Sequence, residues 1–320
     1  KCREQNENLA IIFINIQGFK EINDSLGHDL GDKLLIELSK RLQLLMNDNY
    51  FLARSDGDEF VILCKSVTDD SDIKRFANTL LSYIKKPFII ESAILNIIVN
   101  IGISIFPQDG VDADTLVQNA DIAMSKAREK TDDKICFYVK EMSAEINERF
   151  LLANYLIDAL SNNQFTLNYQ PIFDIKTSKK IMALEALLRW RNPLLGAVPP
   201  DKFIPLAEKT GQIITIGEWV LREVCQQINL WQHKGYHVVP IAVNISVKQL
   251  EQVGFAKTVM EIMKRYNVES HLIELEITES VSTGNLAIIR MNLKALKTHG
   301  IKISMDDFGT GFSSLAQLNL

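Results

Sequence analysis

The second half of the chain repeats one pattern at a nearly constant interval. Short apolar runs rich in Ile, Val and Leu end in a polar side chain, and Asn244, Glu276 and Asp306 follow one another at intervals of 32 and 30 residues. A helical segment separates each run from the next. A strand with its following helix occupies about 30 residues. The interval therefore predicts a parallel α/β array in which a polar residue lies at the end of each strand.

This array predicts part of a barrel. In a (β/α)8 barrel, side chains at the C-terminal ends of the strands surround the mouth, and Glu185 is expected at the end of a strand as well. We expect five strands here, fewer than the eight of a complete TIM-like barrel. We therefore expect the natural protein to continue past Leu320, and this chain alone to be inactive or unable to fold. The strands are expected at 166–173, 180–187, 238–245, 272–278 and 302–305.

The polar residues of the array offer oxygen ligands only. They are Glu185, Asn244, Glu276, Asp306 and Asp307. Hard divalent cations such as Mg²⁺ or Mn²⁺ prefer carboxylate and amide oxygens. The adjacent Asp306 and Asp307 can serve two ions, and such a pair would stabilise both oxygens of a phosphoryl displacement. Carboxylates at strand ends without a metal fit the spacing equally well, so the pattern alone leaves both interpretations open.

The first half predicts a different α/β unit. Asp56 and Gly57 lie between two apolar runs, which is a strong hairpin signal. We expect one sheet with its helices on one side, and a pairing of the strand at 88–90 with one long strand at 94–105. Segment 140–163 has a helical period and is expected to link the halves. Other strands are expected at 9–16, 51–54, 60–64 and 135–138, and helices at 29–45, 72–84 and 115–130.

Composition excludes several classes of protein. An apolar fraction of 47% and a charged fraction of 23% are typical of a globular chain, not of a disordered one. The net charge of -5 weighs against binding of a nucleic acid polymer. Four widely spaced cysteines argue against a disulfide framework or a zinc site, and no apolar run is long enough to span a membrane. We expect a cytoplasmic location, and leave open a membrane tether preceding Lys1.

Six motifs between residues 165 and 320 carry a resemblance to a known family. They are YQP at 169–171, EALLRW at 185–190, FIPLAE at 203–208, VNIS at 243–246, ELEITES at 274–280 and DDFGTG at 306–311. Together they closely resemble the EAL family of cyclic-di-GMP phosphodiesterases. The resemblance implies hydrolysis of cyclic-di-GMP to linear pGpG with two Mg²⁺ or Mn²⁺ ions.

The same resemblance implies a role for each matching residue. Catalysis would involve Glu185, Asp306 and Asp307. The first metal would be bound by Glu185, Asn244, Glu276 and Asp306, and the second by Asp307. Substrate would be bound by Gln170 and Leu187 at the guanine and by Arg189 at the phosphate, since a planar guanidinium suits that role. Glu279 would anchor the DDFGTG loop, which couples a homodimer interface to the site.

Residues 9–138 resemble the GGDEF family of diguanylate cyclases. The matching residues are FKEINDSLGH at 19–28, Gly31-Asp32, Arg54 and SDGDEF at 55–60. The family has a palm-like α/β sandwich of the nucleotide-cyclase type. Asn23, Asp32 and Asp58 match its nucleotide-binding positions. Several departures bear on activity, and among them Asp56 replaces a glycine and Asn15 replaces a metal-binding aspartate.

These resemblances imply a tandem signalling protein. We expect a degenerate GGDEF domain at 1–139, a linker helix at 140–163 and the N-terminal part of an EAL domain at 164–320, with a sensor domain upstream. Our hypothesis is a phosphodiesterase regulated by a cyclase-dead domain, whose binding of GTP stays open. The alternatives are a non-catalytic cyclic-di-GMP receptor and a dimerising scaffold, while Asn15 and Asp56 disfavour an active cyclase.

Overall fold

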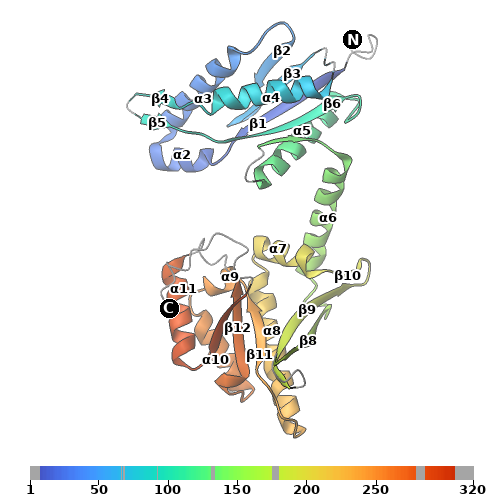
Figure 1. Cartoon of the computed structure of the whole chain (residues 1–320), viewed down its shortest axis with the longest axis vertical. Coiled ribbons are helices and arrows are strands. Elements are labelled where there is room, and N and C mark those ends of the chain that lie inside the picture. Colours follow the sequence, from blue (N-terminus) through green and yellow to red (C-terminus); the bar gives the residue numbers. More distant parts are fainter. Residues whose placement is uncertain are drawn as a thin grey trace. The chain divides into compact units, whose positions relative to one another are not determined.

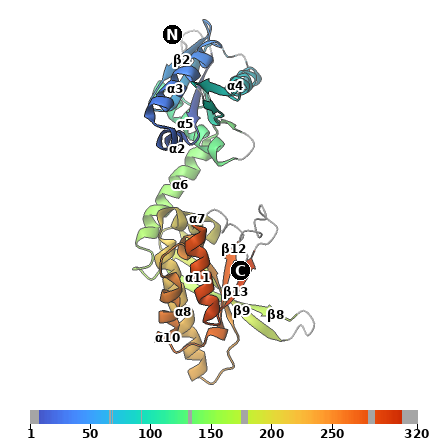
Figure 2. The same ribbon diagram turned by 90° about the vertical axis from the view of Figure 1, so that its left-hand side faces the viewer.

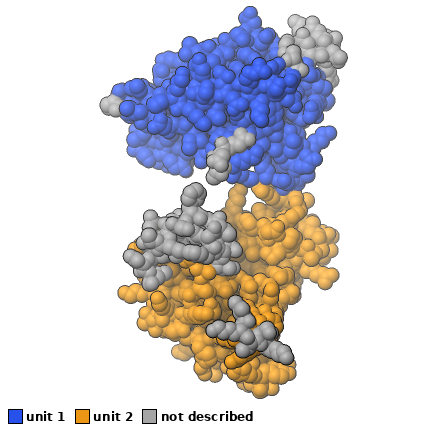
Figure 3. All heavy atoms as spheres, viewed as in Figure 1, with its two compact units in different colours: residues 1–147 blue, residues 148–320 orange. Residues whose placement is uncertain are grey.

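The computed structural model describes residues 8–65, 67, 69–91, 93–130, 134–174, 180–278 and 285–306. The chain divides into two compact units, residues 1–147 and 148–320 (Figure 3). The boundary falls within helix α6 (Lys140–Ile157), in the segment predicted to link the halves. Each unit is built on its own sheet and its own hydrophobic core.

The first unit has a five-stranded sheet in the order β2-β3-β1-β6-β7. Strand β1 lies at its centre because nearly every one of its residues is buried. The five strands are β1 (Leu9–Ile16), β2 (Tyr50–Arg54), β3 (Glu59–Cys64), β6 (Val99–Phe106) and β7 (Ile135–Phe137). The helices are α2 (Phe19–Leu26), α3 (His28–Gln43), α4 (Asp70–Ile84) and α5 (Ala113–Glu129).

Helices cover both faces of this sheet (Figure 1). Ile12 belongs to the buried cluster that includes Leu38 of α3 and Leu80 of α4. Phe13, on the opposite face of β1, belongs to a second cluster with Ala120 of α5. The prediction that all helices lie on one side is therefore wrong. A strand with apolar side chains on both of its faces needs cover on both, as β1 shows between Ala10 and Ile14.

The predicted strand at 94–105 is also wrong, because the structure divides it in two. Strand β5 (Ala93–Leu95) pairs with β4 (Phe88–Ile90) in a separate two-stranded sheet, whereas β6 begins at Val99 and pairs with β1. Asn96 interrupts the apolar run near the break, but Asn100 interrupts it again inside β6, so the sequence pattern does not locate the break. Within β6, a Cβ at Gly102 would lie 2.0 Å from the carbonyl oxygen of Ala120, so only glycine lets α5 approach this closely.

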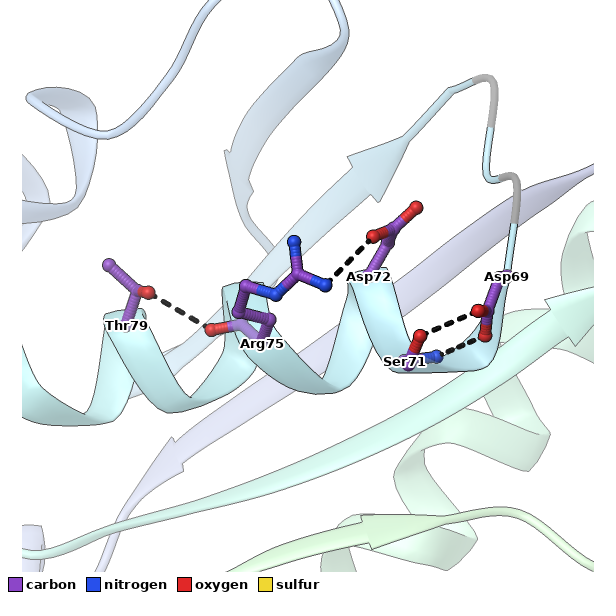
Figure 4. A network of polar contacts seen from close by, with 5 residues as sticks. All are labelled: Asp69, Ser71, Asp72, Arg75 and Thr79. Carbon is purple, nitrogen blue, oxygen red and sulfur yellow. Dashed lines mark hydrogen bonds and ion pairs between the residues drawn. The ribbon is translucent and has the colours of Figure 1, made fainter.

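Helix α4 begins in a local polar network (Figure 4). Asp69 accepts hydrogen bonds from the backbone nitrogen and the hydroxyl of Ser71, both at 2.6 Å. Arg75 forms an ion pair with Asp72 at 3.4 Å, and the Thr79 hydroxyl donates to the carbonyl oxygen of Arg75 at 2.9 Å. An aspartate at this position satisfies backbone amides that the first helical turn leaves unpaired. The network therefore fixes the start of the helix.

The second unit has a six-stranded sheet, along which β10, β9, β11, β12 and β13 follow in order, with β8 paired to β9. Strands β9, β11, β12 and β13 are parallel, as expected. Strand β8 is antiparallel to β9, so its predicted place in the parallel array is wrong. Residues 174–180 are too few for the crossover that parallel strands require. The strands are β8 (Phe165–Phe173), β9 (Ile181–Asn192), β10 (Gly196–Val198), β11 (Ile241–Ile245), β12 (Ile273–Thr278) and β13 (Lys302–Asp306).

Helices gather on one side of this second sheet (Figure 2). Alternate strand residues such as Val243 and Leu275 belong to the buried cluster that includes Val224 of α8 and Leu293 of α11. The other strand face carries Asn244 and Glu276. The predicted fold class, a palm-like α/β sandwich followed by a partial (β/α)8 barrel, is confirmed. The helices are α7 (Pro200–Thr210), α8 (Ile213–His233), α9 (Val247–Leu250), α10 (Phe255–Arg265), the 3₁₀ helix η1 (Ser270–Leu272) and α11 (Leu286–Thr298).

None of the helices in the described ranges has both the length and the apolar character needed to cross a bilayer.

Candidate functional site

Strand register brings the predicted metal ligands onto one face of the second sheet. Asn244 of β11 lies directly opposite Glu276 of β12. Glu185 of β9 and the backbone of Asp306 at the end of β13 each lie two residues out of step with that pair. Side chains of a strand alternate between faces, so an even offset keeps all four positions on the same face. This is the face opposite the helices.

A hydrogen bond joins two of these residues. The amide nitrogen Nδ2 of Asn244 donates to Oε1 of Glu185 at 2.9 Å. Asn244 is exposed, and Glu185 and Glu276 are half-buried. In this orientation the Asn244 oxygen and the second Glu185 oxygen are not used by the bond between them. The bond therefore leaves one oxygen of each side chain as an acceptor.

The sequence pattern predicted Glu185 at the end of its strand, and this prediction is wrong because Glu185 lies within β9. Strand β9 continues to Asn192 because β8 and β10 pair with its second half. Glu185 reaches the polar row through its register with β11 instead. The correction changes where the residue sits along the strand, while the face that it shares with Asn244 stays the same.

The described side chains of the predicted metal site suit a hard cation. The side chain of Asp306 and all of Asp307 and Glu279 lie outside the described residues. Among the side chains that are described, no group of three or more His, Cys, Asp or Glu converges as a metal site. Glu185, Asn244 and Glu276 offer oxygen atoms alone, which is the chemistry that Mg²⁺ and Mn²⁺ prefer.

The predicted substrate residues share this face. Gln170 of β8 is exposed and lies opposite Glu185 in register. Leu187 and Arg189 follow Glu185 at alternate positions of β9, and both are half-buried. Arg189 uses one guanidinium nitrogen, Nη1, to donate to the carbonyl oxygen of Leu188 at 3.0 Å. A cation next to a row of carboxylates suits a ligand that presents both phosphate and bound metal.

A contact beside the site escaped the sequence reasoning. The Ser246 hydroxyl, two residues after Asn244, donates to Oε1 of Glu208 at 2.6 Å. Glu208 lies in the last turn of α7, where the helix dipole disfavours a negative charge. This unfavourable position and the place of Glu208 at the end of the FIPLAE motif were the local signals that Glu208 makes a tertiary contact.

In the first unit, the residues predicted to bind a nucleotide form two groups, one beside the β2–β3 hairpin and one on α2 and α3. Asn15 at the end of β1 donates from Nδ2 to Oδ2 of Asp58 at 2.9 Å, and it lies opposite Glu59 in register. The predicted hairpin is present, since β2 and β3 pair on either side of Gly57. Arg54 closes the turn by donating to the Gly57 carbonyl oxygen at 2.9 Å and 2.6 Å. Asp58 is thus held by an amide from the neighbouring strand.

Asn23 of α2 and Asp32 of α3 form the second group of residues predicted to bind a nucleotide. Gly31 allows Asn23 to pack closely, because a Cβ there would lie 1.9 Å from Oδ1 of Asn23. This oxygen is buried and has no hydrogen-bond partner within the described part of the chain. Asp32 is exposed. A buried acceptor without a donor costs free energy, which a ligand N–H group would recover.

The carboxyl group of Glu59 should make the stability of the first unit depend on pH. Burial, followed by repulsion from Asp121, Asp58 and Asp56, raises the pKa of the Glu59 carboxyl above its usual value. Its charged form therefore destabilises the folded first unit at neutral pH, and this penalty disappears as the pH falls through the raised pKa. We expect Glu59→Gln to stabilise the first unit at pH 7.5 and to have little effect at pH 4, measured as unfolding free energy by hydrogen exchange. Asp48→Asn, which changes an exposed acid outside any helix or strand, is the control, and an equal gain at both pH values contradicts the prediction.

Comparison with known proteins finds the same two modules in the same order. A family model of the EAL domain matches residues 153–320, and one of the diguanylate cyclase GGDEF domain matches residues 1–134. Over 310 residues the chain is 40% identical to the bifunctional diguanylate cyclase/cyclic di-GMP phosphodiesterase MucR of Pseudomonas aeruginosa, a match that covers 97% of this chain and 45% of that protein.

Two further similarities extend along nearly the whole chain. The cyclic di-GMP phosphodiesterase NbdA of Pseudomonas aeruginosa is 33% identical over 317 residues, covering 99% of this chain and 40% of that protein. A solved structure of Vibrio cholerae LapD, comprising S helix, GGDEF and EAL and bound to c-di-GMP, has a TM-score of 0.56 at 19% identity. It covers 97% of this chain and 72% of that one, and shows likeness of fold alone. The chain spans less than half the length of the two curated relatives.

Proposed function

Because the chain belongs to the EAL family and carries a GGDEF domain ahead of its EAL domain, we propose that the protein hydrolyses cyclic-di-GMP to linear pGpG. The observation that carries this proposal is the row of Glu185, Asn244 and Glu276 on one sheet face, with Arg189 beside it. The names of MucR and NbdA, both described as phosphodiesterases of this nucleotide, support the choice of substrate.

Each residue of the row has a task in this proposal. Glu185, Asn244 and Glu276 would hold the first of two Mg²⁺ or Mn²⁺ ions together with Asp306, and Asp307 would hold the second. When bound, the ions supply Lewis-acid polarisation of one phosphodiester and of the attacking water. The bond from Asn244 to Glu185 orients both side chains before any ligand arrives.

The remaining residues bind and orient the substrate. Arg189 would hold the phosphate that is cleaved, because its guanidinium presents several parallel donors to phosphate oxygens. Gln170 and Leu187 would line the pocket for one guanine, since they flank Glu185 on the same face. The attacking water displaces the 3′ oxygen of one nucleotide, which opens the ring and leaves pGpG.

The test is turnover by the full-length protein. Cyclic-di-GMP is incubated with the protein and Mg²⁺ or Mn²⁺, and the products are separated by chromatography. We expect pGpG with either ion and none after a chelator is added. Binding of intact nucleotide without pGpG would overturn the proposal in favour of a non-catalytic receptor.

For the first unit we propose a cyclase-dead regulatory domain that binds GTP. The hydrogen bond from Asn15 to Asp58 supports the loss of synthesis, because it places a neutral amide where a second carboxylate would be needed to bind metal. The buried Oδ1 of Asn23, for which the described residues provide no hydrogen-bond donor, supports a guanine ligand, whose N–H groups could donate to it. Synthesis of cyclic-di-GMP from GTP by the full-length protein would overturn this proposal, and the name of MucR shows that a relative is described as having both activities.

A further inference from the structure

The loop that follows Asn244 is held by contacts to two helices. Strand β11 ends at Ile245, and Ser246 caps the short helix α9. The Ser246 hydroxyl accepts from the backbone nitrogen of Lys248 at 3.3 Å, while the backbone nitrogen of Ser246 donates to Oε1 of Gln249 at 3.1 Å. This reciprocal pair fixes the exit of the strand locally.

The first external contact comes from α7. The Ser246 hydroxyl donates its one hydrogen to Oε1 of Glu208 at 2.6 Å. Glu208 is half-buried, and no ion pair to it is found within the described residues. A hydrogen bond to a charged acceptor contributes more to stability than a hydrogen bond to a neutral acceptor. The Ser246 bond therefore offsets a charge that the end of α7 disfavours.

The second external contact comes from α8. Gln249 is 2% exposed, and its side chain packs directly against Gly217, where a Cβ would lie 2.0 Å from Nε2 of Gln249. The glutamine can enter only because α8 carries a glycine at this point. The segment that follows β11 is thus held by two contacts. Glu208 accepts a hydrogen bond from Ser246, and Gly217 packs closely against Gln249.

We propose that Glu208 is a positioning residue of the metal site. It acts through Ser246 to hold the end of β11, and thereby sets the position of Asn244 beside Glu185 and Glu276. In this proposal Glu208 acts only through Ser246, so its loss weakens metal binding and leaves the chemical step intact. This inference rests on the proposed function, because it assigns a metal to the row of Asn244 and its neighbours.

The test measures Mn²⁺ affinity by calorimetry in the full-length protein. Partners that orient metal ligands typically contribute a factor of about 10–100 to affinity. We expect Glu208→Ala to weaken Mn²⁺ binding by at least about tenfold on this basis. Glu208→Gln keeps an oxygen acceptor for the Ser246 hydroxyl and should stay within about threefold of the parent protein, well inside the effect expected for the alanine variant. Asp201→Ala, an exposed acid on the same helix, is the matched control and should leave the affinity unchanged.

Turnover separates positioning from a general loss of structure. With Glu208→Ala, hydrolysis of cyclic-di-GMP should fall at limiting Mn²⁺ and return to the parent rate at saturating Mn²⁺. An unchanged Mn²⁺ affinity, a glutamine variant as weak as the alanine variant, or a rate that saturating metal does not restore would each overturn the inference. If the parent protein itself binds no Mn²⁺, the proposed metal-dependent function fails, and this inference fails with it.

Discussion

Glu185→Gln is expected to lower cyclic-di-GMP turnover by about a thousandfold or more, which corresponds to roughly 4 kcal/mol of activation free energy. The substitution removes one negative charge from the oxygen row while it preserves the shape of the side chain. The new amide oxygen can still accept from Nδ2 of Asn244, as Oε1 of Glu185 does at 2.9 Å. The loss should therefore come from weaker metal binding, because a neutral amide is a poorer ligand for a hard cation than a carboxylate.

The control for this prediction is Glu261→Gln, the same chemical change on the exposed surface of α10. Its turnover and thermal stability should match those of the parent protein. Thermal unfolding without metal should also be unchanged in Glu185→Gln. Turnover by Glu185→Gln within tenfold of the parent rate would contradict the assignment of Glu185 to the metal site.

Trp190→Ala is expected to destabilise the second unit by about 3–5 kcal/mol, as truncation of a buried tryptophan typically does. Trp190 is 1% exposed, and its ring lies 5.5 Å from that of Phe203 and 6.1 Å from that of Phe165. Its Nε1 also donates to Oε1 of Gln164 at 3.0 Å. The substitution removes all of these contacts and leaves a cavity in the core beneath β9.

Hydrogen exchange followed by mass spectrometry resolves this effect by unit. Backbone amides of the second unit should exchange faster in Trp190→Ala, while those of the first unit serve as an internal reference. Tyr236→Ala, which truncates an aromatic side chain that is 62% exposed, is the matched control. Equal acceleration in both units, or none in the second, would contradict the prediction.

Much of the candidate site could be predicted from residue types and intervals. The spacing of Asn244, Glu276 and Asp306 indicates one strand and helix for each residue, and parallel strands in one sheet bring such positions together. The EAL motifs added Arg189 and a role for Glu185, which the strand pattern already included, and the family assignment is confirmed. The structure places Glu185, Asn244 and Glu276 on one face, and the pattern could indicate this grouping because it depends on local periodicity, which can be read along the chain.

Other features depended on which segments meet in space. The antiparallel direction of β8, the second helical layer formed by α5 and the mid-strand position of Glu185 all follow from the choice of pairing partner and register. A one-residue change of register would move every side chain of a strand to the opposite face, and local periodicity does not specify the partner.

The clearest examples are two hydrogen bonds. Asn15 and Asp58 are 43 residues apart in the chain, and Glu208 and Ser246 are 38 residues apart. Nothing in the neighbourhood of either residue identifies its partner. Residue order thus predicted that side-chain oxygens would recur on successive parallel strands. Folding decided which oxygen meets which donor, because long-range packing brings together groups that local sequence leaves independent.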